Sequence, residues 1–361
     1  MTSPDGRGPD GRTPDPTSPD LTRPDLTQPD PTPPDLTPRE AGVLAAQVLD
    51  AVERAVVGKR EALELVLAGI MAGGHVLLED VPGLGKTLLA RSFAQVLGLD
   101  FRRVQFTPDL LPADITGSFI VDARGEFVFR RGPIFANLLL GDEINRTPPK
   151  TQAALLESMQ EHQVSVEGQT YPLPEPFIVL ATANPIEHEG TYPLPEAQLD
   201  RFLLRVSLGY PSADAEWEVL VRRLRRQREG QVLDPIADRA GVIGLQRAVE
   251  KVAVEESIGR YCVLLVRATR EHRTVMVGAS PRGALALMQT ARARALLNGR
   301  DFVVPEDVKA VVVPALAHRL VLEPETWLRR VTTAHVLEEV LNQVAAPQSG
   351  ARPTYVDVQA R

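Results

Sequence analysis

Residues 79–87 read Glu-Asp-Val-Pro-Gly-Leu-Gly-Lys-Thr and lie between an apolar run at 76–78 and an amphipathic stretch that begins at Leu88. This order predicts a strand, a tight loop and a helix, which is the setting of a phosphate-binding loop. Glycines let backbone N–H groups turn toward phosphate oxygens, and the N-terminus of the helix adds partial positive charge. The pattern G-x-x-x-x-G-K-[ST] has glycine where this chain has Asp80, so the loop needs support from the rest of the sequence.

Short apolar runs alternate with helical patterns around this loop. The pattern after the loop predicts a helix at 86–97, and the apolar runs predict five strands, at 75–79, 101–106, 137–140, 177–181 and 203–208. Strands that alternate with helices favour a mainly parallel sheet that is covered on both faces. Apolar pairs that flank turn residues predict two β-hairpins, 119–121 with 127–129 and 164–166 with 170–172.

The composition divides the chain into four parts. Residues 1–38 form a tail in which Pro-Asp recurs every five residues; with almost nothing apolar to bury, the tail is expected to be a disordered spacer. Residues 39–210 carry the alternation of strands and helices. Residues 211–345 are almost wholly helical and predict a separate domain, with helices at 217–224, 259–269, 281–297 and 305–316. The polar residues 346–361 predict a flexible C-terminal tail.

Charge and cysteine content restrict the function classes. The net charge of −7 provides no broad basic field for nucleic acid. Cys262 is the single cysteine, which excludes an internal disulfide and fits a reducing cytoplasm, and its apolar neighbours predict a buried thiol. No apolar run is long enough to span a bilayer, and the N-terminus lacks the features of a signal peptide. We therefore expect a cytoplasmic protein without membrane insertion.

Polar side chains follow two of the predicted strands. Asp142 and Glu143 come at the end of the third strand, and Asn184 at the end of the fourth. Ligands of open α/β sheets bind at these carboxyl ends, where Asp142 is expected to hold Mg²⁺ and Glu143 to orient or deprotonate a water. The acidic pair is also compatible with a helix N-cap. Arg201 is compatible with an ion pair inside the chain, with Asp200 or Glu196, which its residue type favours. It is also compatible with a finger that reaches a neighbour's nucleotide.

The order of these motifs resembles that of an AAA+ ATPase, and the wording is closer still to the MoxR family. The similarity covers roughly residues 40–345 and is carried by GGHVLLEDVPGLGKT, RVQFTPDLLPADITG, RRGPIFANLLLGDEINRTPPKTQAALLESMQE, ATANP, EGTYPLPEAQLDRF and ASPRG. The resemblance implies an α/β fold, with a parallel P-loop sheet followed by a C-terminal helical lid domain. In this family a residue other than glycine stands at the position of Asp80, and Pro-Gly-x-Gly makes the turn.

The resemblance also implies roles for single residues. The catalytic set that it implies is Lys86, Glu143, Asn184 as sensor 1, Arg201 as the arginine finger and Arg282 as sensor 2. The residues that it implies for binding ATP are Val57, Gly58, Pro82, Gly83, Leu84, Gly85, Lys86, Thr87 and Leu88. Thr87 and Asp142 would hold Mg²⁺. The two hairpins resemble the helix-2 insert and the pre-sensor-1 hairpin of this clade.

The family implies an ATPase that works as a ring, a hexamer, with each site at a subunit interface. It further implies chaperone-like assembly, maturation or activation of client proteins, often with a partner that carries a von Willebrand factor A domain. Two alternatives stay open: a nucleic-acid motor or metal-chelatase subunit, and a nucleotide-gated scaffold with negligible turnover. The acidic balance argues against the nucleic-acid motor.

Overall fold

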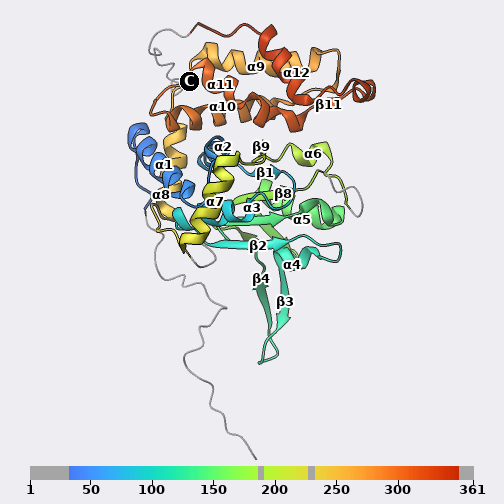
Figure 1. Ribbon diagram of the computed structural model, residues 1–361. Helices are drawn as coiled ribbons and strands as arrows, with labels where there is room; N and C mark the ends of the chain where they lie inside the picture. Colours follow the sequence, from blue (N-terminus) through green and yellow to red (C-terminus); the bar gives the residue numbers. More distant parts are fainter. Residues whose placement is uncertain (1–31, 186–190, 227–231, 349–361) are drawn as a thin grey trace, which may run out of the picture. The chain divides into compact units, whose positions relative to one another are not determined.

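The computed structural model describes residues 32–185, 191–226 and 232–348, and in 327–329 the backbone alone (Figure 1). Most of the two tails expected from the sequence, 1–31 and 349–361, lies outside the described residues. The described N-terminal segment 32–37 leads directly into the first helix, α1 (Pro38–Glu53).

A five-stranded parallel sheet forms the centre of the α/β part. Its order is β2-β5-β8-β1-β9, with β2 (Phe101–Gln105), β5 (Leu138–Asp142), β8 (Ile178–Ala183), β1 (Val76–Glu79) and β9 (Leu204–Val206). These are the five strands expected from the apolar runs, with ends that differ by at most two residues. The parallel sheet and the helices around it confirm the α/β fold class.

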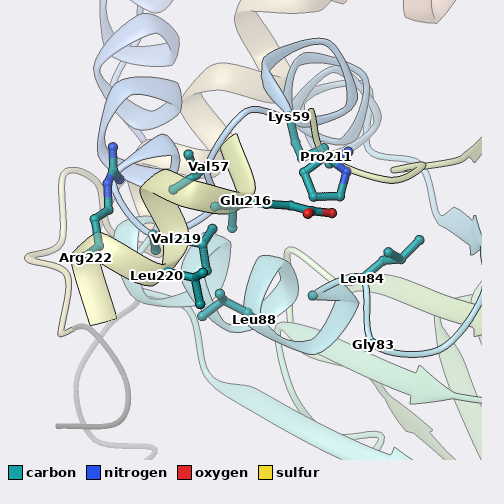
Figure 2. A pocket seen from close by; sticks show the side chains of 13 residues that line it. Val57, Lys59, Gly83, Leu84, Leu88, Pro211, Glu216, Val219, Leu220 and Arg222 are labelled. Atoms are coloured by element: carbon teal, nitrogen blue, oxygen red, sulfur yellow. The ribbon is translucent and has the colours of Figure 1, made fainter. Parts of the chain in front are cut away.

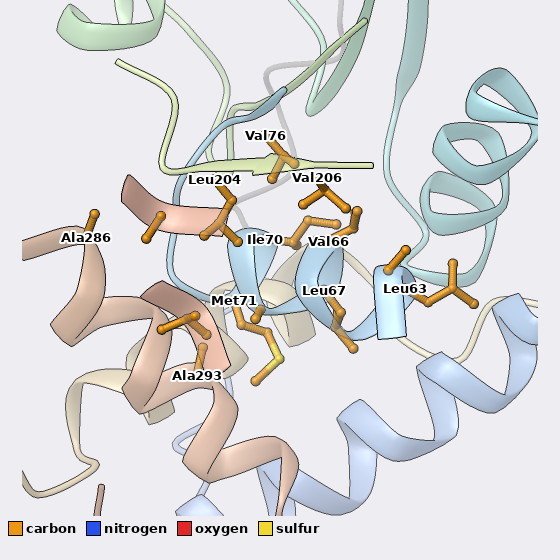
Figure 3. Close-up of a cluster of buried hydrophobic side chains, with 14 of the residues drawn as sticks. Leu63, Val66, Leu67, Ile70, Met71, Val76, Leu204, Val206, Ala286 and Ala293 are labelled. Atoms are coloured by element: carbon orange, nitrogen blue, oxygen red, sulfur yellow. The ribbon is translucent and has the colours of Figure 1, made fainter. Parts of the chain in front are cut away.

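Alternate residues of the strands enter two different hydrophobic cores, so helices cover both faces of the sheet. On one face Leu138 and Leu140 pack with α1, α2 (Arg60–Met71) and α3 (Lys86–Val96). On the other face Leu139 packs with α5 (Pro149–Glu161) and α4 (Pro112–Thr116). Figure 3 shows apolar side chains of α2 facing the strand residues Val76 and Leu204.

Two antiparallel hairpins extend from this part of the chain and confirm the sequence expectation. One is β3 (Gly117–Val121) with β4 (Phe127–Arg131), and the other is β6 (Gln163–Val166) with β7 (Gln169–Pro172). The rings of Phe129 and Tyr171 stack with centroids 4.2 Å apart, so the hairpins contact each other through side chains.

The C-terminal half is mainly helical. Its elements are α6 (Glu196–Leu199), α7 (Ala213–Arg226), α8 (Arg239–Glu250), α9 (Glu256–Glu271), α10 (Pro281–Leu297), α11 (Pro305–Leu316), α12 (Thr333–Gln343) and the strand pair β10 (Val275–Val277) and β11 (Val321–Leu322), with short 3₁₀ turns at Ile144–Arg146, Ala317–Arg319 and Pro324–Arg329. The sequence analysis missed α8, α12 and the strand pair. Cys262 is buried in α9 as expected, and burial raises its pKa to about 11. None of the helices in the described part of the chain has the length and apolar character needed to cross a bilayer.

The hydrophobic core runs on from the α/β part into the helical part. A single cluster contains buried residues of α1, α2 and α3 together with residues of α8, α9, α10 and α11. The expected domain boundary at residue 211 therefore coincides with a change in secondary structure and not with a break in packing. It stays a prediction.

The described part of the chain begins before the expected end of the N-terminal tail at residue 38. Asp35 forms an ion pair with Lys251, whose Nζ also donates to the carbonyl oxygen of Leu36 at 2.9 Å. The Leu36 side chain packs against the main core, and Thr37 caps α1 by accepting from the N–H of Glu40. The packing of Leu36 and the ion pair of Asp35 with Lys251 therefore hold the last Pro-Asp repeat against the folded chain.

Candidate functional site

The loop between β1 and α3 has the backbone that a phosphate-binding loop requires. Gly83 and Gly85 both have φ of +85°, in the left-handed region that favours glycine. A Cβ at either position would meet nothing within 4 Å, so conformation rather than space requires glycine there. Gly85 is the N-cap of α3, and the loop lines a cavity of about 350 Å³ together with the start of that helix.

The contacts of the Asp80 side chain explain why aspartate, and not glycine, stands at this position of the loop. Its side chain is 7% exposed and accepts hydrogen bonds from Ser207 Oγ at 2.7 Å, from Gly209 N at 3.3 Å and from Leu208 N. Its carbonyl oxygen accepts from Lys86 Nζ at 2.6 Å. Asp80 therefore fastens the loop to the chain that leaves β9, which a glycine does not do.

Lys86 lies at the base of this cavity. Burial lowers the pKa of its ammonium group, and the carboxylates of Asp80, Asp142, Glu143 and Glu79 oppose that shift. A half-buried cation that faces several carboxylates can exchange them for the oxygens of an anionic ligand.

The acidic pair and Asn184 lie in the same cavity as Lys86 and Thr87, as the sequence analysis expected. The sheet order brings this about, because β8 lies between β5 and β1 and the carboxyl ends of parallel strands meet at one edge. Thr182, which the sequence analysis missed, fixes the pair. Its hydroxyl donates to Asp142 Oδ1 at 2.6 Å and accepts from the N–H of Glu143 at 2.8 Å.

Two residues of β2 also contact the acidic pair and were missed. Arg103 donates from Nη2 to Asp142 Oδ2 at 2.7 Å and to Gln105 Oε1 at 2.8 Å. Gln105 donates from Nε2 to Glu143 Oε2 at 2.8 Å, and Arg146 pairs with the same oxygen at 3.1 Å. The alternation of β2 buries Val104 and places Arg103 and Gln105 together on the opposite side, but it does not indicate which strand they lie beside.

A second cavity of about 490 Å³ adjoins the first and shares Gly83 and Gly85 with it (Figure 2). Its walls are mainly apolar, and its lining residues are Ala55, Val56, Val57, Lys59, Gly83, Leu84, Gly85, Leu88, Pro211, Glu216, Val219, Leu220 and Arg222. Val57, Leu84 and Leu88, which the family resemblance implies for nucleotide binding, all line this cavity. Gly58 lines neither cavity; it has φ of +68°, and a Cβ there would lie 2.6 Å from the Cβ of Ala215. Its role in this structure is to let α7 approach.

The two arginines of the expected catalytic set lie elsewhere. Arg201 and Arg282 line a third cavity, of about 300 Å³, that shares no lining residue with the cavity of Lys86. Arg319 lines it too and donates from Nε to Asp200 Oδ1 at 2.7 Å. Asp200, one of the two partners that the intrachain alternative offered Arg201, is therefore paired with Arg319.

Comparisons with known proteins agree with this architecture. The family described as "ATPase family associated with various cellular activities (AAA)" matches residues 75–204, and the AAA lid domain matches 267–340. The chain is 48% identical over 305 residues to the "Uncharacterized protein YeaC" of Bacillus subtilis, covering 84% of this chain and 95% of that protein. It is 45% identical over 312 residues to "Chaperone MoxR1" of Mycobacterium tuberculosis, with coverage of 84% and 82%.

A further relative is "Protein MoxR" of Methylorubrum extorquens, 35% identical over 329 residues, with coverage of 84% and 95%. Among solved structures, a Cytophaga hutchinsonii protein named "putative ATPase" superposes with a TM-score of 0.80 at 42% identity, covering 85% of this chain and 96% of that one. The loop, the strand-end acids and the helical lid, together with these relatives, establish that the chain belongs to the MoxR family of AAA+ ATPases.

Proposed function

We propose that the chain hydrolyses ATP to ADP and phosphate with Mg²⁺, the triphosphate in the cavity of Lys86 and the base in the adjoining apolar cavity. The observation that carries this proposal is the convergence of Lys86, Thr87, Asp142, Glu143 and Asn184 on one cavity at the N-terminus of α3. That cavity joins a largely apolar one through the two loop glycines, so one nucleotide can extend through both.

The residues present fit Mg²⁺. Thr87 and Asp142 offer hard oxygen ligands in the cavity, and Mg²⁺ in nucleotide enzymes needs only one or two protein oxygens beside phosphates and water. Held by Thr87 and Asp142, Mg²⁺ would neutralise charge on the phosphate oxygens.

The side chains of this chain would do the rest by position and charge. Lys86 would exchange the carbonyl oxygen of Asp80 for phosphate oxygens. Glu143 would orient the attacking water and take its proton, after giving up the bonds from Gln105 and Arg146 that now hold its Oε2. Asn184 would hold the same water without adding charge.

The positions of Arg201 and Arg282 support a site that is completed between subunits. A guanidinium group stabilises the transition state only where it reaches the transferred phosphoryl group, and neither arginine lines the cavity of Lys86. We therefore propose that both act on the nucleotide of an adjacent subunit in a ring, a hexamer by family resemblance. The relative named as a chaperone supports a chaperone-like role. By family resemblance we also propose that the chain acts in the cytoplasm with a partner that carries a von Willebrand factor A domain.

Mixed-subunit ATPase measurements test the proposal. Glu143→Gln should bind ATP without turnover, and Arg201→Ala and Lys86→Ala should each be inactive alone, with losses of about 10³-fold or more for the finger. In an equimolar mixture of Arg201→Ala and Lys86→Ala, about a quarter of the ring interfaces would pair an intact loop with an intact arginine, so activity should return toward that fraction.

An equimolar mixture of Arg282→Ala and Lys86→Ala tests in the same way whether Arg282 acts on the nucleotide of an adjacent subunit. Arg267→Ala, an exposed arginine of α9 that lines none of the three cavities, is the matched control and should keep full activity. Subunit exchange without any return of activity would refute an intersubunit site. Wild-type turnover no faster than that of Glu143→Gln would refute hydrolysis and favour the scaffold alternative.

A further inference from the structure

The apolar cavity holds one polar group that the proposed chemistry leaves unused. Three of its lining side chains are charged: Lys59, Arg222 and Glu216. Lys59 Nζ donates to the carbonyl oxygen of Gly209 at 2.9 Å, and Arg222 donates from Nη1 to the carbonyl oxygen of Arg54 at 2.6 Å. Glu216 is exposed to solvent, and within the described part of the chain its carboxylate has neither a hydrogen bond nor an ion pair.

The direction of the Glu216 side chain makes this group relevant to a ligand. Glu216 lies in the first turn of α7, and Figure 2 shows its carboxylate extending into the space between Pro211 and Leu84. Around it the cavity offers apolar surface from Val57 and Leu220, which suits the faces of a purine ring. An ionised carboxylate can only accept hydrogen bonds, so it selects for a donor on the edge of the ligand.

We propose that Glu216 is the residue that selects adenine, by accepting a hydrogen bond from the 6-amino group of the base. This inference rests on the proposed ATP function. Carboxylates accept from exocyclic amino groups of bases, whereas the 6-oxo group of guanine is itself an acceptor and would oppose the carboxylate. The apolar walls bind any purine, and Glu216 distinguishes among purines.

Calorimetric binding on the full-length chain in a Glu143→Gln background tests this without turnover. The probes are ATP, GTP and purine riboside triphosphate, which differs from ATP only by lacking the 6-amino group. The starting protein should bind ATP roughly tenfold more tightly than purine riboside triphosphate, the size of one hydrogen bond to a charged group. Glu216→Met, of similar length but without an acceptor, should bring that ratio close to one, and Glu216→Gln should give an intermediate ratio.

Asp214→Asn is the matched control, because it removes the same charge from the same first turn of α7 at a residue that does not line the cavity. It should keep the tenfold ratio. An equal ratio in the starting protein and in Glu216→Met would overturn the proposal. A second result would also overturn it: Glu216→Met lowers the affinity for ATP and for purine riboside triphosphate equally but leaves the affinity for 2′-deoxyATP unchanged. That pattern would show that the carboxylate contacts the ribose and not the base.

Lys86→Ala separates this proposal from the ATP site itself. If Lys86→Ala lowers ATP affinity while Glu216→Met leaves the ratio of the affinities for ATP and purine riboside triphosphate unchanged, only the proposed role of Glu216 is refuted. If the chain binds no nucleotide, or binds ATP equally well after Lys86→Ala, the ATP site is refuted and the selection by Glu216 falls with it.

Discussion

Replacing Asp80 with glycine would give the loop the pattern G-x-x-x-x-G-K-T, and we expect this change to harm the protein. The carboxylate of Asp80 is buried and accepts from Ser207 Oγ and from the N–H groups of Leu208 and Gly209. Asp80→Gly leaves all three donors without this partner. It brings no conformational benefit, because Asp80 is not among the residues with positive φ.

The magnitude follows from these contacts. Hydrogen bonds to a charged group are worth about 1.5–3 kcal/mol each and are not additive, so we expect a net loss of about 3 kcal/mol in the free energy of unfolding. The freedom of glycine in the unfolded chain adds about 0.5–1 kcal/mol. A total near 3–4 kcal/mol corresponds to a fall in Tm of about 5–6 °C for a cooperative unit of about 300 residues.

Thermal and urea unfolding, followed by circular dichroism, measure this loss. Ser207→Ala removes one of the three donors and should cost only about 1 kcal/mol. ATP affinity should fall as well in Asp80→Gly, because the chain that leaves β9 continues to Pro211 and α7, which line the apolar cavity. An Asp80→Gly protein as stable as wild type, with unchanged ATP affinity, would refute the anchoring role of Asp80.

Two further predictions concern buried ionisable side chains. His75 accepts from the N–H of Val179 at Nδ1 and lies 3.0 Å from the carbonyl oxygen of Met159 at Nε2, and burial lowers its pKa to about 4. The unfolded chain takes up a proton near pH 6.5 and the folded chain does not, so stability should fall as pH drops from about 6.5 to 4, by roughly 1.4 kcal/mol per pH unit from this group. His75→Gln should flatten that part of the urea-midpoint profile, and an unchanged slope would contradict the assignment. Arg319→Met leaves Asp200 without its cation and should cost about 3 kcal/mol in urea unfolding, against almost none for the exposed Arg267→Met. A loss below about 1 kcal/mol would show that the pair adds little.

The strands could be predicted because their signal is local. The apolar runs of β5 and β8 are buried on both faces, and their length and flanking residues are visible in the sequence. Helix α8 was missed because Gly241 and Gly244 weaken its helical pattern. Gly244 is explained only by tertiary contact, since a Cβ there would lie 2.9 Å from Pro34, some two hundred residues earlier in the chain.

The candidate site divides in the same way. The proximity of Lys86, Glu143 and Asn184 could be predicted from the order of the strands in the sequence, because parallel strands place their carboxyl ends at one edge of the sheet. The contacts of Arg103 and Gln105 could not be predicted, because they depend on β2 lying beside β5 rather than beside β1, the strand it follows in the chain. Residue type favoured an ion pair of Arg201 with Asp200 or Glu196, whereas in the fold Asp200 pairs with Arg319, which is more than one hundred residues later in the chain.

The contacts around residues 79–87 separate stability from chemistry. Asp80 accepts from the hydroxyl of the exposed Ser207 and from the N–H groups of Leu208 and Gly209. The bond from Leu208 is buried, so its N–H loses a partner that water does not readily replace when Asp80 is removed. Glu143, in contrast, is held at Oε2 by the side chains of Gln105 and Arg146 at the edge of an open cavity, and these can turn to water. Loss of Asp80 must therefore lower both folding stability and nucleotide affinity, whereas Glu143→Gln keeps the shape of the site and removes only the base. A variant in which turnover falls with Tm unchanged thus points to the strand-end acids, and one in which both fall points to the anchor of the loop.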